Sequence, residues 1–221
     1  MKTKIFQKQN IPNILTIFRI VLVPIIIVLL LVKPINIAYS LKFNLSNQIC
    51  LLEISDLQIA AGILFIVASF TDFLDGYLAR RFNVISTFGK FWDPLADKLL
   101  INCTLFCLAS PQQNLVPIWI PIILLVRDFI IDGLRFYMLQ KNIVSAANIY
   151  GKIKTFVLII AISFLFFFGG NQSLISSSYY WGIQNLLLYI ATILSIISGL
   201  IYSLPVIYNI CKRSKEKNET I

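Results

Sequence analysis

Long runs of apolar residues, separated by short polar stretches, dominate the chain. A helix needs about 20 predominantly apolar residues to cross a bilayer core about 30 Å thick. Six runs approach or exceed this length, and they cover residues 12–33, 57–80, 92–110, 116–139, 152–170 and 183–209. The pattern predicts an all-α, polytopic membrane protein with six transmembrane helices.

The stretches outside these runs are too short to form a separate soluble domain. Residues 1–11 are polar and basic, and we expect them to form either an amphipathic segment in the membrane interface or a frayed tail. Residues 12–209 are predicted to be one transmembrane domain and residues 210–221 a basic cytoplasmic tail. Residues 34–56 make the longest connection, which we expect to be an external loop with little order.

Charge is scarce, and its distribution predicts the orientation of the chain. Hydrophobic residues make up 58% of the sequence and charged residues 13%, with a net charge of +9. The basic residues are not gathered in one patch with interleaved aromatics, which argues against nucleic acid as a partner. They cluster instead before the first run, after the last, and in alternate connections, so the positive-inside rule places both termini in the cytoplasm.

Four aspartates stand at the cytoplasmic ends of the second and third predicted helices. Asp72 and Asp75 are three residues apart, and Asp93 and Asp97 are four apart, so each pair projects from one face of its helix. An isolated aspartate in hydrocarbon costs about 2.5–3.5 kcal/mol, which favours divalent cations between the two pairs. Because the chain has no histidine, the ligands are oxygens and the expected metal is Mg²⁺ or Mn²⁺, as two ions.

The residues from Asp72 to Asp97 follow the spacing D(x)2DG(x)2AR(x)8G(x)3D(x)3D. This spacing resembles, at all eight fixed positions, the signature of the CDP-alcohol phosphatidyltransferase family. The remaining segments are most similar to the bacterial branch that makes phosphatidylglycerophosphate. The resemblance implies transfer of a phosphatidyl group from the membrane lipid CDP-diacylglycerol to glycerol 3-phosphate, with release of CMP. It also implies a homodimer whose active site faces the cytoplasm at the bacterial plasma membrane.

The same resemblance implies roles for the signature residues. It makes Asp97 the base that takes the proton of the acceptor hydroxyl, with Asp93 beside it in catalysis. Gly76 and Ala79 would leave room for the ligand, although such small residues also serve helix packing. The implied metal ligands are Asp72, Asp75, Asp93 and Asp97, and the implied CDP-lipid contacts are Asp72, Gly76, Ala79, Arg80 and Gly89.

Cations on other helices are candidates for binding the phosphate of the acceptor. Arg19 would lie about 10 Å into the first span, where it either faces a cavity or extends back to the interface. Arg127 and Arg135 lie two turns apart on one face, where they either grip a phosphate bidentately or form a salt-bridge cluster with Asp128 and Asp132. The full candidate set is Asn13, Thr16, Arg19, Arg127, Arg135, Lys152 and Lys154.

Two local questions stay open at the level of sequence. Lys152 and Lys154 are two residues apart, so a regular helix cannot turn both toward one point. Pro94 follows Asp93 directly, so either Asp93 caps a helix there or a helix that began near Gly89 runs through the proline. The last predicted span carries no candidate residue and is expected to form a lipid or dimer surface.

Three other functions compete with this interpretation. Within the family they are a CDP-alcohol-type cardiolipin synthase and a phosphatidylinositol-phosphate synthase. Outside it, a cation transporter could use the carboxylates as a midplane ion site. The aspartates, however, stand near the cytoplasmic ends of their helices, and no acidic residues continue to the other side.

Overall fold

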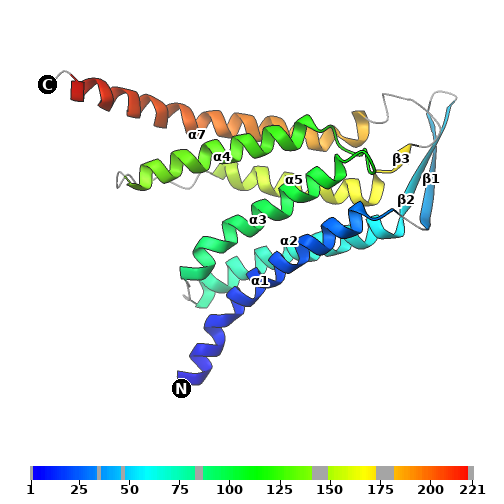
Figure 1. Ribbon diagram of the computed structural model, residues 1–221, viewed down its shortest axis with the longest axis horizontal. Helices are drawn as coiled ribbons and strands as arrows, with labels where there is room; N and C mark the ends of the chain where they lie inside the picture. The colour runs from blue at the N-terminus through cyan, green and yellow to red at the C-terminus, as the bar shows by residue number, and fades with distance from the viewer. Residues whose placement is uncertain are drawn as a thin grey trace.

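The computed structural model describes residues 2–33, 36–45, 48–82, 87–140, 149–172 and 182–218. Six long helices run side by side in these ranges and form a bundle (Figure 1). They are α1 (Lys2–Leu31), α2 (Asp56–Phe82), α3 (Thr87–Leu108), α4 (Trp119–Gln140), α5 (Ile149–Phe168) and α7 (Leu186–Asn218). Each predicted run corresponds to one of these helices, so the mostly helical architecture is confirmed.

Apolarity alone marks only part of this bundle as membrane-spanning. Among the described residues, two helical segments are long and apolar enough to cross a membrane, Ile14–Leu31 and Leu186–Leu204. The helical segment Ile153–Phe168 is apolar but shorter. Helix α4 is not among these apolar segments because it contains four charged residues.

The connection between α1 and α2 was predicted to be a loop, and this prediction is wrong. Strands β1 (Ile37–Leu45) and β2 (Gln48–Ser55) pair antiparallel there, and β3 (Asn171–Gln172) adds a third strand beside β2. Apolar and polar residues alternate along β1 from Tyr39 to Leu45, a period of two that is typical of a strand. The Tyr39 hydroxyl donates to the Phe167 carbonyl oxygen at 2.5 Å, which ties the sheet to the end of α5.

The boundaries of three helices, α1, α3 and α7, add to what the sequence predicted. Helix α1 begins at Lys2, so residues 2–11 are helical and continuous with the first predicted run. Helix α3 begins at Thr87 and runs through Pro94, so Asp93 does not cap it. Helix α7 likewise continues past residue 209 to Asn218.

Close contacts between apolar faces hold the bundle together. Helix α1 packs against α2 and α3, α7 packs against α4 and α5, and α2 packs against α5. Phe65 and Phe166 meet in the core with ring centroids 5.7 Å apart. Helices α2 and α5 approach this closely because residue 62 is glycine, since an added Cβ there would lie 2.7 Å from the Phe166 Cβ.

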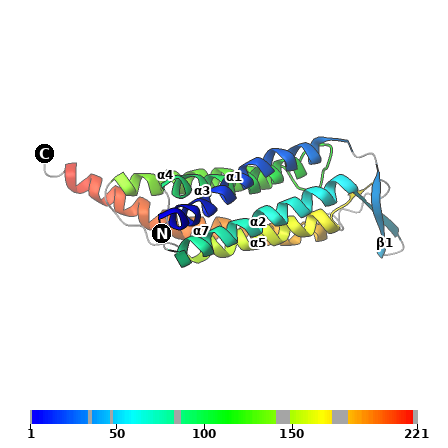
Figure 2. The same cartoon turned by 90° about the horizontal axis from the view of Figure 1, so that it is seen from below.

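The two ends of the bundle differ in character. Both chain termini lie at one end, where α2 and α4 finish and α3 and α5 begin, and the sheet lies at the opposite end (Figures 1 and 2). The helix ends that border the predicted cytoplasmic connections therefore gather at one end of the bundle. The signature aspartates lie toward this same end.

Candidate active site

Helix α1 contacts one aspartate from each signature pair. Arg19 is fully buried, and its Nη1 lies 2.6 Å from the Asp72 Oδ1 of α2. Thr16, one turn earlier and also fully buried, donates from Oγ1 to the Asp93 Oδ1 of α3. Arg19 therefore faces protein and does not extend back to the membrane interface. Thr16 and Arg19 lie on the face of α1 that is turned toward the aspartates.

The carboxylates of α2 and α3 face a common region. The Asp72 carboxyl lies within electrostatic range of Asp93, and the Asp97 carboxyl lies within range of Asp72 and Arg19. The charges of Lys154 and Asp128 also act on the Asp97 carboxyl. The structure does not describe the surroundings of six predicted site residues, so their predicted roles stay untested. They are Asn13, Asp75, Gly76, Ala79, Arg80 and Gly89.

The carboxylates suit a hard divalent cation, although the described residues alone do not form a complete metal-binding site. Asp72, Asp93 and Asp97 offer only carboxylate oxygens, the ligand type that Mg²⁺ and Mn²⁺ prefer. Within the described side chains, no three potential ligands converge on one point. Asp75, the fourth carboxylate of the signature, is not among those side chains.

A second charged cluster joins α4, α5 and α7. The Asp128 Oδ1 accepts from Lys154 Nζ at 2.6 Å and from Arg127 Nη1 at 2.7 Å, so one carboxylate holds two cations. Lys154 is buried, so this one of the two candidate lysines faces the interior of the bundle. The side chain of Lys152 lies outside the described residues.

Helix α7 contributes to this cluster, which the sequence analysis did not predict. Arg127 Nε donates to the Ser195 carbonyl oxygen at 3.1 Å, and Arg127 Nη2 donates to the Ser198 hydroxyl at 2.5 Å. Ser195, Ser198 and Gly199 are small residues spaced three and four apart on one helix face. That spacing was the available signal, but small residues on a transmembrane helix equally indicate helix packing.

Arg135 lies in different surroundings from Arg127. Its guanidinium carbon is 6.0 Å from the centroid of the Tyr202 ring, and the side chain is exposed. Asp132, the predicted partner of Arg135, accepts instead from Lys98 Nζ of α3. The structure therefore brings Arg127 together with Lys154 and leaves Arg135 at the edge of the bundle.

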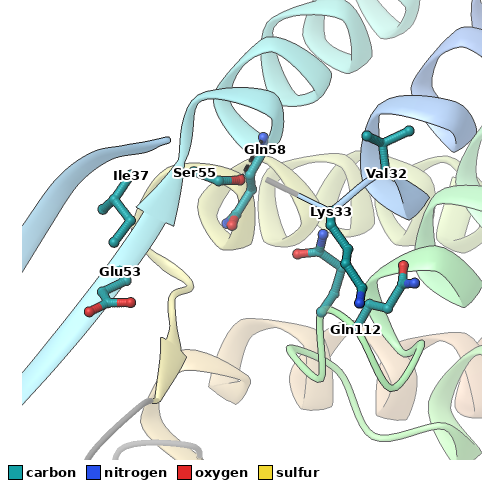
Figure 3. A pocket seen from close by; sticks show the side chains of 8 residues that line it. Val32, Lys33, Ile37, Glu53, Ser55, Gln58 and Gln112 are labelled. Atoms are coloured by element: carbon teal, nitrogen blue, oxygen red, sulfur yellow. Dashed lines mark hydrogen bonds between the residues drawn. The ribbon is translucent and has the colours of Figure 1, made fainter. Parts of the chain in front are cut away.

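A cavity of about 260 Å³ lies at the opposite end, beside the sheet (Figure 3). Lys33, Glu53, Gln58 and Gln113 are among the residues that line it. Gln58 and Gln113 donate from their side-chain amides to carbonyl oxygens at the ends of α5 and α1. Because none of the predicted site residues lines this cavity, it is not the candidate active site.

Comparison with known proteins decides the family. The family model described as CDP-alcohol phosphatidyltransferase matches residues 9–197. The chain belongs to the CDP-alcohol phosphatidyltransferase family. The match extends from α1 into α7, so it includes both the aspartate region and the Arg127–Asp128–Lys154 cluster.

Three relatives in this family carry one name, CDP-diacylglycerol–glycerol-3-phosphate 3-phosphatidyltransferase. The Bacillus subtilis protein is 38% identical over 195 residues, which is 86% of this chain and 91% of that protein. The Mycoplasma pneumoniae protein is 40% identical over 206 residues (90% and 88%), and the Rickettsia typhi protein is 33% identical over 195 residues (88% and 95%). With the apolar segments of α1 and α7, these matches indicate a membrane protein of bacterial origin.

Proposed function

We propose that this chain transfers the phosphatidyl group of CDP-diacylglycerol to sn-glycerol 3-phosphate, giving phosphatidylglycerophosphate and CMP. The observation that carries the proposal is that one face of α1 binds two signature aspartates, Arg19 the Asp72 carboxylate and Thr16 the Asp93 carboxylate, in a bundle that also holds Arg127 and Lys154 on one carboxylate. Carboxylates suit proton transfer at a hydroxyl, and paired cations suit a phosphate dianion. The relatives named for this reaction cover most of the chain and support the same conclusion.

The reaction exchanges one phosphorus–oxygen bond for another. The acceptor hydroxyl oxygen bonds to the lipid-linked phosphorus, the bond from that phosphorus to CMP breaks, and the hydroxyl proton passes to Asp97. Asp97 is suited to this role because its carboxyl is close enough to Asp72 and to Lys154 to feel the charge of both. Arg127 and Lys154 bind the phosphate of the acceptor, which holds its hydroxyl near Asp97.

The metal requirement is part of the proposal. Asp72, Asp75, Asp93 and Asp97 would hold Mg²⁺ or Mn²⁺, with Arg19 as the neighbouring fixed charge. Such ions, when bound, would polarise the phosphorus and stabilise the departing CMP. Gly76, Ala79, Arg80 and Gly89 would surround the CDP-lipid beside them.

We further propose that all six long helices cross the membrane, with both termini and the aspartates on the cytoplasmic side. The basic residues that precede α1, separate α2 from α3 and α4 from α5, and follow α7 support this orientation. Placement of both termini at one end of the bundle supports it as well (Figure 1). A homodimer is expected from the family.

A transfer assay tests the proposed reaction. Purified protein in detergent, with CDP-diacylglycerol and Mg²⁺, should convert radiolabelled glycerol 3-phosphate to lipid-soluble product with equimolar CMP. EDTA should stop this reaction, and added Mg²⁺ or Mn²⁺ should restore it. CMP release with inositol phosphate or phosphatidylglycerol as the preferred acceptor would contradict the proposed substrate, and metal uptake into vesicles without CMP release would contradict transfer altogether.

A further inference from the structure

The Arg127 side chain leaves α4 and lies against α7. Its Nε donates to the Ser195 carbonyl oxygen at 3.1 Å, and its Nη2 donates to the Ser198 hydroxyl at 2.5 Å. These two acceptors stand about one helical turn apart. One edge of the planar guanidinium is therefore held at two points on a neighbouring helix, so the group cannot turn freely.

Helix α7 also provides the space that this arrangement needs. A Cβ added at Gly199 would lie 3.1 Å from Arg127 Nε and 3.2 Å from Arg127 Cγ. These distances are shorter than ordinary van der Waals contact, so a larger residue at 199 would displace the arginine. Ser198 and Gly199 together set where the guanidinium lies.

The fixed guanidinium keeps donors for a ligand. It carries five N–H groups, one on Nε and two on each terminal nitrogen. The contacts to Ser195, Ser198 and Asp128 use one N–H on each nitrogen, which leaves one on Nη1 and one on Nη2. The arginine side chain is 17% exposed, so it is not sealed inside the bundle. Two N–H groups on adjacent nitrogens match the bidentate geometry with which arginine binds phosphate.

The position of Arg127 is linked to that of the second cation, Lys154. Asp128 accepts from both Arg127 and Lys154, and Lys154 is buried with little room to move. Fixing Arg127 on α7 therefore also fixes the separation between the two positive charges. A phosphate dianion that contacts both cations requires such a fixed separation.

We propose that Ser198 is a positioning residue for the acceptor, with Gly199 providing the space beside it. It orients the Arg127 guanidinium so that the remaining N–H groups point toward the phosphate of the incoming glycerol 3-phosphate. Ser198 does not touch the acceptor and acts only through Arg127. The inference rests on the proposed function, because it requires Arg127 to bind the acceptor phosphate.

A selective change in KM distinguishes this role from a purely structural one. Ser198→Ala should raise the KM for glycerol 3-phosphate about 5-fold to 20-fold, because it removes a hydrogen bond to a charged group. The KM for CDP-diacylglycerol should stay unchanged, which a general loss of stability would not produce. The matched control is Ser203→Ala, since Ser203 is a buried serine of α7 whose hydroxyl donates to the Leu200 carbonyl of its own helix.

A double-mutant cycle separates this inference from the proposed function. In an Arg127→Ala background, which should itself raise the KM for glycerol 3-phosphate, Ser198→Ala should cause no further increase. Equal effects of Ser198→Ala in both backgrounds, or equal changes in both KM values, would overturn the positioning role while leaving the acceptor role of Arg127 intact. An unchanged KM in Arg127→Ala alone would instead overturn the acceptor role.

A second variant covers the case in which Ser198→Ala fails to fold. Gly199→Ala keeps the serine hydroxyl and crowds the arginine by a few tenths of an ångström. It should give the same selective rise in the KM for glycerol 3-phosphate. An unchanged KM in a folded Gly199→Ala protein would contradict the inference.

Discussion

Arg19 is a residue whose charge is unfavourable to bury by itself, yet it contacts the aspartates of the candidate site. Its guanidinium is fully buried and lies 2.6 Å from an Asp72 oxygen. Removing one partner of a fully buried ion pair costs about 3–5 kcal/mol. The Asp72 side chain is 37% exposed, so solvent reduces this cost here. Arg19 therefore supplies positive charge at the carboxylates before any divalent cation binds.

This arrangement predicts a metal-dependent stability change in Arg19→Met. Without the guanidinium, Asp72 and its neighbouring carboxylates repel each other, so the thermal unfolding midpoint in EDTA should fall. Added Mg²⁺ should raise the midpoint more in the variant than in the unmodified protein, because the ion supplies the missing charge. The control is Arg135→Met, where the exposed arginine lies against Tyr202 and the change should be small. Equal Mg²⁺ shifts in Arg19→Met and the unmodified protein would refute a shared carboxylate site.

Asp97→Asn tests the proposed base at the same scale. The amide keeps the shape of the side chain but cannot take a proton, so kcat should fall about 10²-fold to 10⁴-fold. Binding of CDP-diacylglycerol should change little. CMP release and equilibrium binding of the lipid substrate measure the two effects separately. Parallel loss of binding would assign Asp97 to ligand or metal contacts and remove it from proton transfer.

At the scale of elements, the site depends on helices that are distant in sequence. Helix α1 contacts aspartates on α2 and α3 through Arg19 and Thr16. Helix α7 holds an arginine of α4, which in turn shares a carboxylate with a lysine of α5. Small shifts between these helices would separate donors from acceptors, so the packing of the bundle sets the geometry of the site.

The α2–α5 contact gives a direct test of this packing. Alanine in place of a helical glycine normally stabilises a helix by about 0.5–1 kcal/mol. Gly62→Ala should nevertheless destabilise the protein by about 1–3 kcal/mol, because the new Cβ meets the Phe166 Cβ at 2.7 Å and forces the helices apart. Gly133→Ala on α4 is the matched control, since a Cβ there meets nothing within 4 Å. Comparable unfolding free energies for the two variants would show that α2 and α5 can separate without cost.

At the scale of the whole molecule, the two ends of the bundle are expected to face different compartments. The sheet closes one end, and the termini and the aspartates lie toward the other (Figure 1). The positive-inside rule predicts that the end with the termini faces the cytoplasm. Soluble glycerol 3-phosphate and CMP would then enter and leave on the cytoplasmic side.

Protease access to spheroplasts tests this orientation. An epitope inserted between β1 and β2 should be cleaved by protease added outside intact spheroplasts that express the protein. An epitope at the C-terminus should be protected until the membrane is lysed. The reverse pattern, or two epitopes with the same accessibility, would contradict an even number of spans with cytoplasmic termini.

The sequence by itself determined the helices and the signature. The length of an apolar run is a local property, so each long run predicted one helix, and the aspartate spacing predicted the family that the comparisons confirmed. The prediction of a loop between α1 and α2 was wrong, because the structure has the strands β1 and β2 there. Each strand is stabilised by the strand beside it and by distant contacts such as Tyr39 with Phe167. The sequence of the segment alone shows neither of these interactions.

Only the tertiary structure decided which charges pair. Spacing along a helix indicates the face on which a residue lies, but it does not indicate the helix that covers that face or the height at which the two cross. Arg19 with Asp72, Lys154 with Asp128 and Arg127 with Ser198 are therefore products of helix packing. In an apolar bundle an unpaired charge is expensive, so the partners that packing brings within reach determine how each buried cation is used.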